Sequence, residues 1–405
     1  MASAAPSLIT PIDANSLKNV VEAHGRYING LPGGRRANLS YTDLRNCSLE
    51  GADLRDAVFS GAILSGALMA GAKLERANLF GCDLRNADLR GADLARADLR
   101  GACLRGANLS QANLAGCDLR EGTIALQDPK NGFRILKHEK RAGELSYAIL
   151  TGATLQGAQM AGTLSSSADF RDANLTGAAM NGAKLCNAML DGADLSNALL
   201  TNTDFSGASL KNTCIVGSTI HSALLDKGAL DGAMGAPPLV VFVDDKPLSE
   251  VIAAHEAWCV TNGAEGEPAV ATGCDFRGGG PLKGRKLTAL KAAGAIFYGL
   301  NLEGVQLQGA DLSGADLRNT NLRGADLRGA KLVDAMMVRA DLRGAKLGAL
   351  EVAPGRFVRS DLTRAVLRMA DLTGVDANRA RFIEADMENA KLDGANLKGA
   401  EFSES

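Results

Sequence analysis

A period of five residues runs through most of this 405-residue chain. In steps of five, 18 consecutive positions from Leu39 to Ile124 carry a large apolar residue, and the residue two places before each is small. Another 18 positions follow from Leu145 to Leu230, all apolar except Ser165, and 24 from Leu287 to Phe402, of which Ala292 and Ala377 are small. A helix repeats every 3.6 residues and a strand every two, so neither accounts for this period. A chain that buries two positions in every five must turn a corner once in each repeat.

The motif at the centre of the repeat is Ala-(Asp/Asn)-Leu, as in residues 87–89 and 107–109. It resembles the repeat of the pentapeptide-repeat proteins, and the resemblance covers about 300 of the 405 residues. It implies an all-β fold, a right-handed quadrilateral β-helix in which four repeats form one square coil. Fixing five residues costs roughly 5–10 kcal/mol of backbone entropy, whereas one buried Leu returns about 1.5–3 kcal/mol. Stability is therefore expected from stacking between neighbouring coils.

Three segments lack the period and divide the chain. We expect a helical cap over residues 1–36 and a first β-helix over 37–234 with a loop insert at 125–144. A linker with a second cap follows over 235–281, and a second β-helix over 282–405. The segment LKNVVEAHGRY of the first cap aligns with LSEVIAAHEAW of the second. The sequence therefore predicts an internal duplication, with a short α-helical cap before each β-helix.

Each cap carries apolar residues at helical spacing on one face. We expect this face to cover the first coil, whose open backbone edge would otherwise promote aggregation. The histidine on each face is either a hydrogen-bonded group of the interface or one of a pair of ligands. The cap residues are Leu17, Val20, Val21, His24 and Tyr27, and then Leu248, Val251, Ile252, His255 and Trp258.

The last repeats have no such helix after them. Phe402 stands at a central position, so we expect an exposed last coil. An exposed apolar coil end is a surface to which a second copy can bind. The sequence therefore predicts a homodimer through the C-terminal coil.

The chain offers little material for catalysis. It has four His, no Cys-x-x-Cys pair among its eight cysteines, and no HExxH or Ser/His/Asp spacing. Cys47, Cys82 and Cys117 occupy the small position of repeats on three different faces of the coil, where they are expected to fill space. Residues 278–286 lack the Gly-Lys-Ser/Thr ending of a phosphate-binding loop. We therefore expect no enzymatic activity, no cofactor and no metal site.

The charges nearly balance, with 44 Lys and Arg against 46 Asp and Glu. This balance argues against direct nucleic-acid binding. Asp and Arg flank the central residue in many repeats, which forms either a patterned docking surface or a solvated face with salt bridges worth about 0–1 kcal/mol each. The pairs are Asp43/Arg45, Asp53/Arg55, Asp83/Arg85, Asp88/Arg90, Asp98/Arg100, Asp118/Arg120, Asp316/Arg318, Asp326/Arg328 and Asp341/Arg343.

The insert at 125–144 has a net charge of +2. Loops on a rigid scaffold often carry function, although surface insertions are also often simply tolerated. The candidate partner-binding residues of this insert are Lys130, Phe133, Arg134, Lys137, His138, Lys140 and Arg141.

These features favour a non-catalytic protein-binding scaffold or adaptor with an unknown protein partner. The resemblance implies an alternative, because some pentapeptide-repeat proteins mimic double-stranded DNA and bind type II topoisomerases such as gyrase. That role needs a strongly negative rod, and only residues 145–234, with net charge −3, approach one. The N-terminus lacks the pattern of a signal peptide, and the longest apolar run, residues 239–243, is far shorter than a membrane helix. We expect a cytoplasmic protein with no membrane partner.

Overall fold

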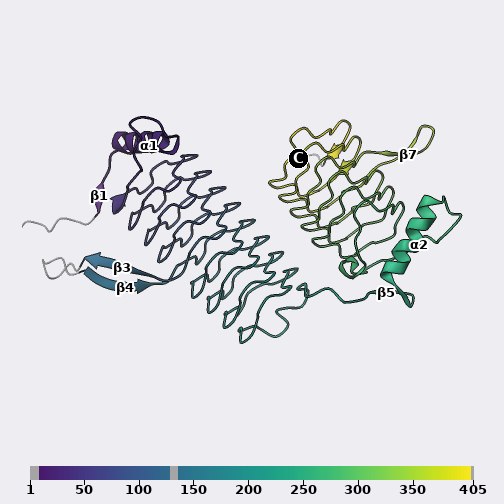
Figure 1. Cartoon of the computed structure of the whole chain (residues 1–405), viewed down its shortest axis with the longest axis horizontal. Helices are drawn as coiled ribbons and strands as arrows, with labels where there is room; N and C mark the ends of the chain where they lie inside the picture. Colours follow the sequence, from purple (N-terminus) through teal and green to yellow (C-terminus); the bar gives the residue numbers. More distant parts are fainter. Residues whose placement is uncertain (1–8, 128–135, 403–405) are drawn as a thin grey trace, which may run out of the picture. The chain divides into compact units, whose positions relative to one another are not determined.

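The stacked coils form two units, each with a core of its own. The computed structural model describes residues 9–127 and 136–402, with the backbone alone for residues 123–127 and 136–139. The units are Met1–Ala236 and Pro237–Ser405. In each unit a helix, α1 (Ala14–Ile28) or α2 (Leu248–Val260), precedes the coils (Figure 1). Among the described residues, no helix has the length and apolar character needed to cross a membrane.

Neighbouring coils pair as parallel strands with a register of 20 residues, which equals four repeats. On one face, Asn38 pairs with Val58 and Val58 with Asn78. The Leu39 N–H donates to the Val58 carbonyl at 2.7 Å, and the Val58 N–H donates to the Ala37 carbonyl at 3.0 Å. Each face contributes one such residue per coil, so the hydrogen-bonded ladders run along the stack rather than along the chain. The expected coil of four repeats is confirmed.

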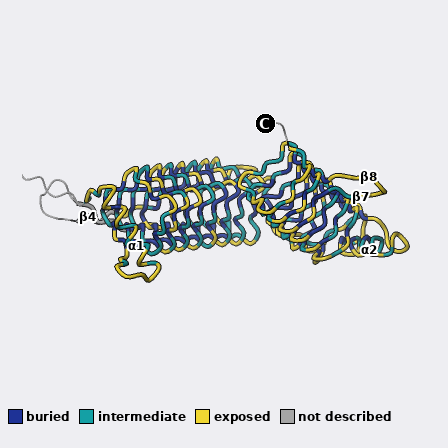
Figure 2. Tube along the Cα trace, turned by 90° about the horizontal axis from the view of Figure 1, so that it is seen from above, coloured by how far each residue is buried: buried dark blue, intermediate teal, exposed yellow. Residues whose placement is uncertain are grey.

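The interior of each stack is filled by the two periodic positions of the repeat. The large central residues point inward, and Leu54 and Leu94 are fully buried. The small residues two places earlier, such as Ala57 and Ala92, are buried as well. Figure 2 shows the buried residues as continuous inner lines along the coils. The small residue leaves room for the large ones of the neighbouring faces, which explains why both positions are restricted.

The corner between two faces requires a left-handed backbone at the second residue after the central one. Gly91 has φ +62° there, and Arg96 has φ +57°. The next residue closes the turn, as where the Ala92 N–H donates to the Leu89 carbonyl at 3.0 Å. A side chain in this conformation costs about 1–2 kcal/mol, which Gly avoids. The corner therefore favours Gly without requiring it.

The polar residue before the central one hydrogen-bonds across the face. The Arg85 N–H donates to Asp83 Oδ1 at 3.2 Å, and the Arg85 guanidinium makes two further bonds to the same carboxylate. Where no Arg follows, the backbone bond remains, as between the Ala95 N–H and Asp93. The nine predicted Asp/Arg pairs are all confirmed as ion pairs within one face. Asp and Asn are thus preferred because they accept a main-chain hydrogen bond.

The predicted insert is an antiparallel hairpin that begins earlier than expected. Its strands are β3 (Gly122–Gln127) and β4 (Leu136–Arg141). Cys103 pairs with Glu144, so the ladder resumes after 21 extra residues and the insert spans 122–142. The prediction that Ile124 occupies a coil position was wrong, because Ile124 lies in β3. An insertion of 21 residues shifts the five-residue period by one, and this shift made the insert visible in the sequence.

A second hairpin leaves no mark in the five-residue period. Its strands are β7 (Leu350–Ala353) and β8 (Arg356–Val358). Lys331 pairs with Asp361, so ten extra residues, 350–359, stand outside the coil. Val352 and Phe357 were predicted at central positions, yet they are 50% and 46% exposed. Because ten is a multiple of five, the period continues through this hairpin unchanged.

The second stack of coils begins before residue 282. Val270 pairs with Lys291, and Asp275 with Ile296, so the first coil of this unit has one residue more than the others. The extra residue follows the 3-10 turn η1 (Phe276–Gly278). It displaces the period by one, so residues 269–281, which the sequence places in the linker, belong to the first coil of this unit.

Short strands complete the two units. In the first, β1 (Thr10–Pro11) pairs in parallel with β2 (Thr42–Asp43). In the second, β5 (Phe242–Val243) and β6 (Lys246–Pro247) form an antiparallel pair just before α2. The parallel pair β9 (Arg381–Phe382) and β10 (Glu401–Phe402) joins the last coil to the one before it.

Candidate functional site

The hairpin β3–β4 projects from the coils of the first unit (Figure 1). Of the predicted binding residues, Lys130, Phe133 and Arg134 lie outside the described residues. Lys137 and His138 lie in β4, opposite Leu126 and Ala125 of β3. Lys140 and Arg141 pair with Thr123 and Gly122, so both residues lie at the base of the hairpin. The hairpin thus collects four of the seven predicted residues on one strand.

Glycines seat the base of the hairpin against the coils. A Cβ on Gly122 would lie 2.9 Å from Phe80 Cε2 and 3.0 Å from the carbonyl oxygen of Arg100. A Cβ on Gly143 would overlap the carbonyl oxygen of Leu119. Both hairpin ends therefore approach the coil backbone more closely than a side chain permits.

Basic and aromatic side chains surround this base. The Arg100 guanidinium lies over the Phe80 ring at 5.5 Å, and that of Arg105 over the Tyr147 ring at 5.1 Å. Tyr147 is 58% exposed, a large value for an aromatic residue. The surface at the hairpin base therefore combines cations with accessible aromatic area, a composition typical of protein-binding sites.

Some of the basic side chains at the hairpin base form ion pairs. Lys140 pairs with Glu121 at 3.3 Å, and Arg105 with Glu144 at 3.4 Å. Burial opposes ionisation of Asp83, but the hydrogen bonds from Arg85 and its charge, with a smaller contribution from Arg141, lower the pKa of that carboxyl group. These exposed pairs contribute little to stability, about 0–1 kcal/mol each. Lys140 and Arg105 therefore each lie beside an acidic residue at the hairpin base.

The cap residues of α1 lie against the first coil of the first unit. Leu17 and His24 are buried, Val20 and Val21 are half-buried, and Tyr27 is 45% exposed. The N-terminus of α1 is capped by Asp13, whose carboxylate accepts the N–H groups of residues 15 and 16 at 2.9 Å.

The cap residues of α2 occupy the equivalent place in the second unit. Leu248, Ile252 and His255 are buried, and Val251 and Trp258 are half-buried. The His255 and Trp258 rings stack with centroids 5.7 Å apart, the same separation as between His24 and Tyr27.

Each buried histidine bridges the two ends of the coil that it covers. The Ala37 N–H donates to His24 Nδ1 at 3.0 Å, and His24 Nε2 lies 3.0 Å from the Arg55 carbonyl. In the second unit the Ala269 N–H donates to His255 Nδ1 at 2.9 Å, and backbone groups of Leu287 and Thr288, at the other end of the coil, also hydrogen-bond to the ring. Burial has the largest effect on the pKa of both rings, and it lowers the pKa. The hydrogen bonds with backbone groups act in the opposite direction and raise it. Of the two interpretations of these histidines, the hydrogen-bonded group fits this geometry.

The cysteines act as interior residues where they are buried. Burial raises the pKa of the Cys47 thiol to about 11 and that of Cys82 to about 12. It also raises the pKa of the Cys117 thiol. A thiol that stays protonated at neutral pH is a weak nucleophile and a weak ligand. Within the described residues, no three His, Cys, Asp or Glu side chains form a cluster that could hold a metal ion.

Comparisons with known proteins agree with the repeat. The family model for pentapeptide repeats matches in eight copies, and the matched residues, 35–121, 148–217, 310–348 and 360–399, make up more than half of the chain. A search of curated proteins finds no significant match.

Solved structures of repeat proteins are similar at low identity. A trypsin-treated form of QnrB1, a plasmid-mediated fluoroquinolone resistance protein, is 17% identical, with 50% of this chain and 90% of that chain covered and a TM-score of 0.33. HetL from the cyanobacterium Nostoc, involved in heterocyst differentiation regulation, is 21% identical, with 96% of both chains covered and a TM-score of 0.20. A thylakoid-lumen protein from Arabidopsis thaliana is 28% identical, with 36% and 67% covered and a TM-score of 0.10. Likenesses this distant assign no role to any residue of this chain.

Proposed function

Because this chain belongs to the pentapeptide-repeat family, we propose that it is a non-catalytic protein-binding scaffold that presents the hairpin β3–β4 to a protein partner. One observation carries this proposal. The ladder continues from Cys103 to Glu144 across the hairpin, so the coils do not need these 21 residues for their pairing. The hairpin base is nevertheless fitted closely to Phe80 and Arg100. A projecting element that the stack does not need, held on a rigid support, is well suited to binding.

The charge of the hairpin suggests the chemistry of the partner. Lys140, Arg105 and Arg120 each pair with a carboxylate that is less exposed than the cation. The side chains of the cations are 77%, 56% and 50% exposed, and those of their acidic partners are 53%, 26% and 22% exposed. Complementary charge steers association and sets specificity. The partner surface is therefore proposed to be acidic.

The alternative, a DNA-mimicking binder of a type II topoisomerase such as gyrase, has one observation in its favour. In residues 145–234, Asp191 and Asp194 accept hydrogen bonds from serine hydroxyl or backbone groups rather than from Arg. Elsewhere the Asp/Arg pairs neutralise the carboxylates that would have to imitate phosphates. We therefore place this alternative second.

Affinity capture with three versions of the chain tests the scaffold. The versions are the full chain, a variant lacking residues 122–142, and a control lacking residues 350–359. Each deletion removes one hairpin and restores the 20-residue register. The control therefore lacks a hairpin as well, but in the second unit. We expect a partner that is captured by the full chain and the control but lost without residues 122–142. A partner held equally by all three versions would contradict the hairpin site, and a topoisomerase subunit among such partners would favour the alternative.

We also propose that the C-terminal coil forms a homodimer. Phe402 stacks on Phe382 with ring centroids 5.3 Å apart, yet Phe402 remains 47% exposed and Leu392 36% exposed. A second copy would cover this apolar area. Light scattering should give twice the monomer mass at micromolar concentration, and Phe402→Asp should return it to the monomer mass. A monomer mass for the unaltered chain would refute the dimer.

We propose an internal duplication of the chain because the two caps make equivalent contacts with their coils. His24 and His255 accept the N–H of the equivalent small residue, Ala37 or Ala269, at the start of each first coil. Exchanging the α2 sequence for that of α1 should then leave the second unit folded, which circular dichroism can test. A second unit that no longer folds would count against the duplication.

We propose a cytoplasmic location, since all eight cysteines are free and a reducing compartment would keep them so. Fractionation of the source cells, with detection of the chain by immunoblotting, tests this assignment.

A further inference from the structure

The first coil of the first unit has an open backbone edge. In the stack, each coil offers hydrogen bonds to the next, as where the Leu68 N–H donates to the Cys47 carbonyl at 2.8 Å and the Leu49 N–H to the Leu68 carbonyl at 2.7 Å. The intervening residue, Ser48, directs its own N–H and carbonyl to the other side, where no coil of the described residues lies. Among the described residues, none accepts the Ser48 N–H or donates to its carbonyl. This face of the coil therefore ends in an exposed, unpaired strand edge.

The preceding face of the same coil shows what such an edge can bind. There, β1 pairs in parallel with β2, with Thr10 opposite Thr42 and Pro11 opposite Asp43. The chain then leaves the edge and enters α1 at Ala14. One added strand thus already completes one face of the coil, while the face of Ser48 lacks its strand.

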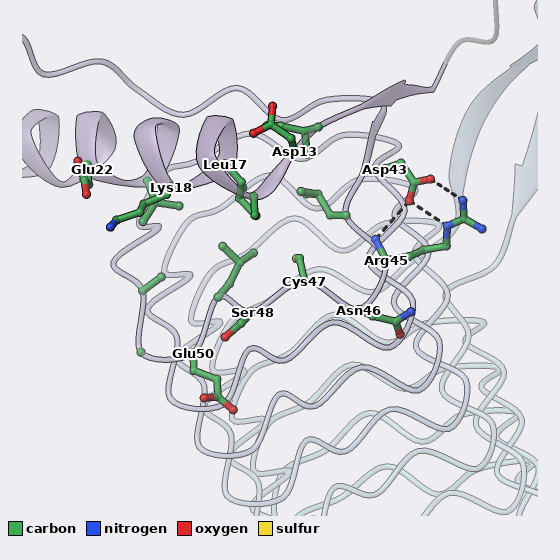
Figure 3. A pocket seen from close by; sticks show the side chains of 17 residues that line it. Asp13, Leu17, Lys18, Glu22, Asp43, Arg45, Asn46, Cys47, Ser48 and Glu50 are labelled. Atoms are coloured by element: carbon green, nitrogen blue, oxygen red, sulfur yellow. Dashed lines mark hydrogen bonds and ion pairs between the residues drawn. The ribbon is translucent and has the colours of Figure 1, made fainter.

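A cavity of about 790 Å³ lies between this edge and the first half of α1 (Figure 3). Its apolar lining comes from Leu17 and Val21 of α1 and from Leu49 and Ala52 of the coil. This volume is within the range of pockets that hold small ligands or short peptide segments. A strand at the edge would place its alternate side chains against this apolar lining.

The rim of the cavity is negative. Asp43 is paired with Arg45 at 2.5 Å, and Asp13 caps the helix. Glu22 and Glu50 are exposed and form no ion pair with a described residue. Lys18 lines the cavity beside them, and Arg90, which is paired with Asp88, lies close enough to Glu50 for the two charges to interact. The uncommitted charge at this rim is therefore acidic, which favours a basic ligand.

We propose that this cavity binds an extended peptide segment of a partner protein, which adds to the edge at Ser48 as a parallel β-strand. An apolar side chain of the segment enters between Leu17 and Leu49, and basic residues on either side of it meet Glu22 and Glu50. Recognition by strand addition uses main-chain hydrogen bonds for affinity and alternate side chains for specificity. The site lies at the N-terminal end of the first stack and does not depend on the hairpin β3–β4.

Fluorescence anisotropy with defined peptides tests the proposal on the full chain. The probes are four fluorescein-labelled seven-residue peptides with Lys at each end, alternating Thr, and Val, Ile, Leu or Phe at the centre. Matched peptides carry Glu at the ends, or N-methyl groups on the two amides beside the centre. We expect at least one Lys-ended peptide to bind, with about ten-fold weaker binding for either matched form, since each loses a charge contact or a main-chain donor.

Variants of the chain locate the site. Ser48→Pro removes the N–H that faces the cavity without removing a hydrogen bond of the stack, because none is made there. We expect it to weaken binding about ten-fold, and Ser48→Ala, which keeps the N–H, to leave binding unchanged. Glu50→Lys, on an exposed side chain, should also weaken the Lys-ended peptide and reduce its salt dependence.

Three outcomes would overturn the proposal. The first is Lys-ended binding that is absent or no tighter than that of the N-methylated form. The second is equal binding by the chain and Ser48→Pro. The third is a change in molecular mass by light scattering on Ser48→Pro or on peptide addition, which would assign the cavity to a second copy. Should Ser48→Pro lose the circular dichroism of the fold, Glu50→Lys and the N-methylated peptides still decide the question.

Discussion

At the scale of single residues, His24 and His255 join the first and fourth repeats of the coil that each one covers. Each ring accepts a main-chain N–H at Nδ1, so the neutral form with a proton on Nε2 is the one that fits. A protonated ring would carry a donor at Nδ1 and lose this bond. The two caps are therefore sensitive to the charge of one residue each.

This arrangement predicts a pH dependence of stability. Burial lowers the pKa of both histidines below the ordinary value of 6.5. The unfolded chain binds protons more readily, so this stability is fully present above pH 6.5 and is lost as the pH falls below it. His24→Phe with His255→Phe should lower the free energy of unfolding at pH 7.5 by about 1–3 kcal/mol per site, because a main-chain N–H loses its acceptor. The same double variant should lose less stability than the unaltered chain between pH 7.5 and 5.5.

Urea unfolding followed by circular dichroism at both pH values measures this difference. His138 and His221 are present in both proteins, so their contributions cancel in the comparison. Equal losses of stability in the two proteins would show that the cap histidines do not titrate as described.

A second prediction concerns Gly143, where the chain returns from the hairpin to the coil. A Cβ at this position would overlap the Leu119 carbonyl, so Gly143→Ala must displace backbone. We expect a loss of more than 2 kcal/mol in the free energy of unfolding, which is typical of forced overpacking. The control is Gly157→Ala at a corner with φ +66° and open space around it, where only the backbone conformation costs about 1–2 kcal/mol. Thermal unfolding of both variants measures the difference, and equal losses would contradict a steric cause at Gly143.

At the scale of elements, the length of an insertion decides whether coils above and below it stay in register. The second hairpin adds ten residues between Ala349 and Ser360, and Lys331 still pairs with Asp361. Ser360 takes the small position of the next repeat and is fully buried. Removing residues 350–359 should therefore leave a continuous β-helix with little change in stability.

Removing only nine residues, 350–358, should interrupt the β-helix. The central positions after the junction would then shift by one relative to the coil below, which exposes Leu362 and buries a polar neighbour. We expect the ten-residue deletion to keep the hydrogen-exchange protection of residues 361–402 and the nine-residue deletion to lose it. Protection of both variants alike would mean that register is not set by this junction.

At the scale of the whole molecule, the two cores share no residue. The first extends from Leu17 to Leu210 and the second from Leu248 to Phe382. Because stacked repeats contact only their neighbours, cooperativity depends on an unbroken stack. We therefore expect two unfolding transitions instead of one.

The single tryptophan makes this expectation measurable. Trp258 lies in α2 of the second unit, so its fluorescence reports that unit alone, whereas far-ultraviolet circular dichroism reports both. In urea the two signals should give different midpoints, and residues 237–405 expressed alone should reproduce the tryptophan curve. Superimposable curves from both probes would indicate one cooperative molecule.

The sequence by itself determined the repeat, its inward positions and the presence of a helix before each set of coils. These follow from local rules: Ala92 and Leu94 are two residues apart and face the same side of an extended segment, and a pair repeated every five residues stays buried only if the chain turns once in each repeat. Asp83 and Arg85 were correctly placed beside each other for the same reason, since both neighbours of an inward residue point outward.

The tertiary structure decided which repeats stack and what stands outside the stack. Val352 and Phe357 have the residue types of central positions, but pairing between Lys331 and Asp361 leaves them on a hairpin. The open edge at Ser48 is equally invisible in the sequence, because every repeat offers the same backbone groups. The physical reason is that inward or outward orientation is a property of five consecutive residues, whereas stacking depends on main-chain hydrogen bonds between residues twenty or more apart.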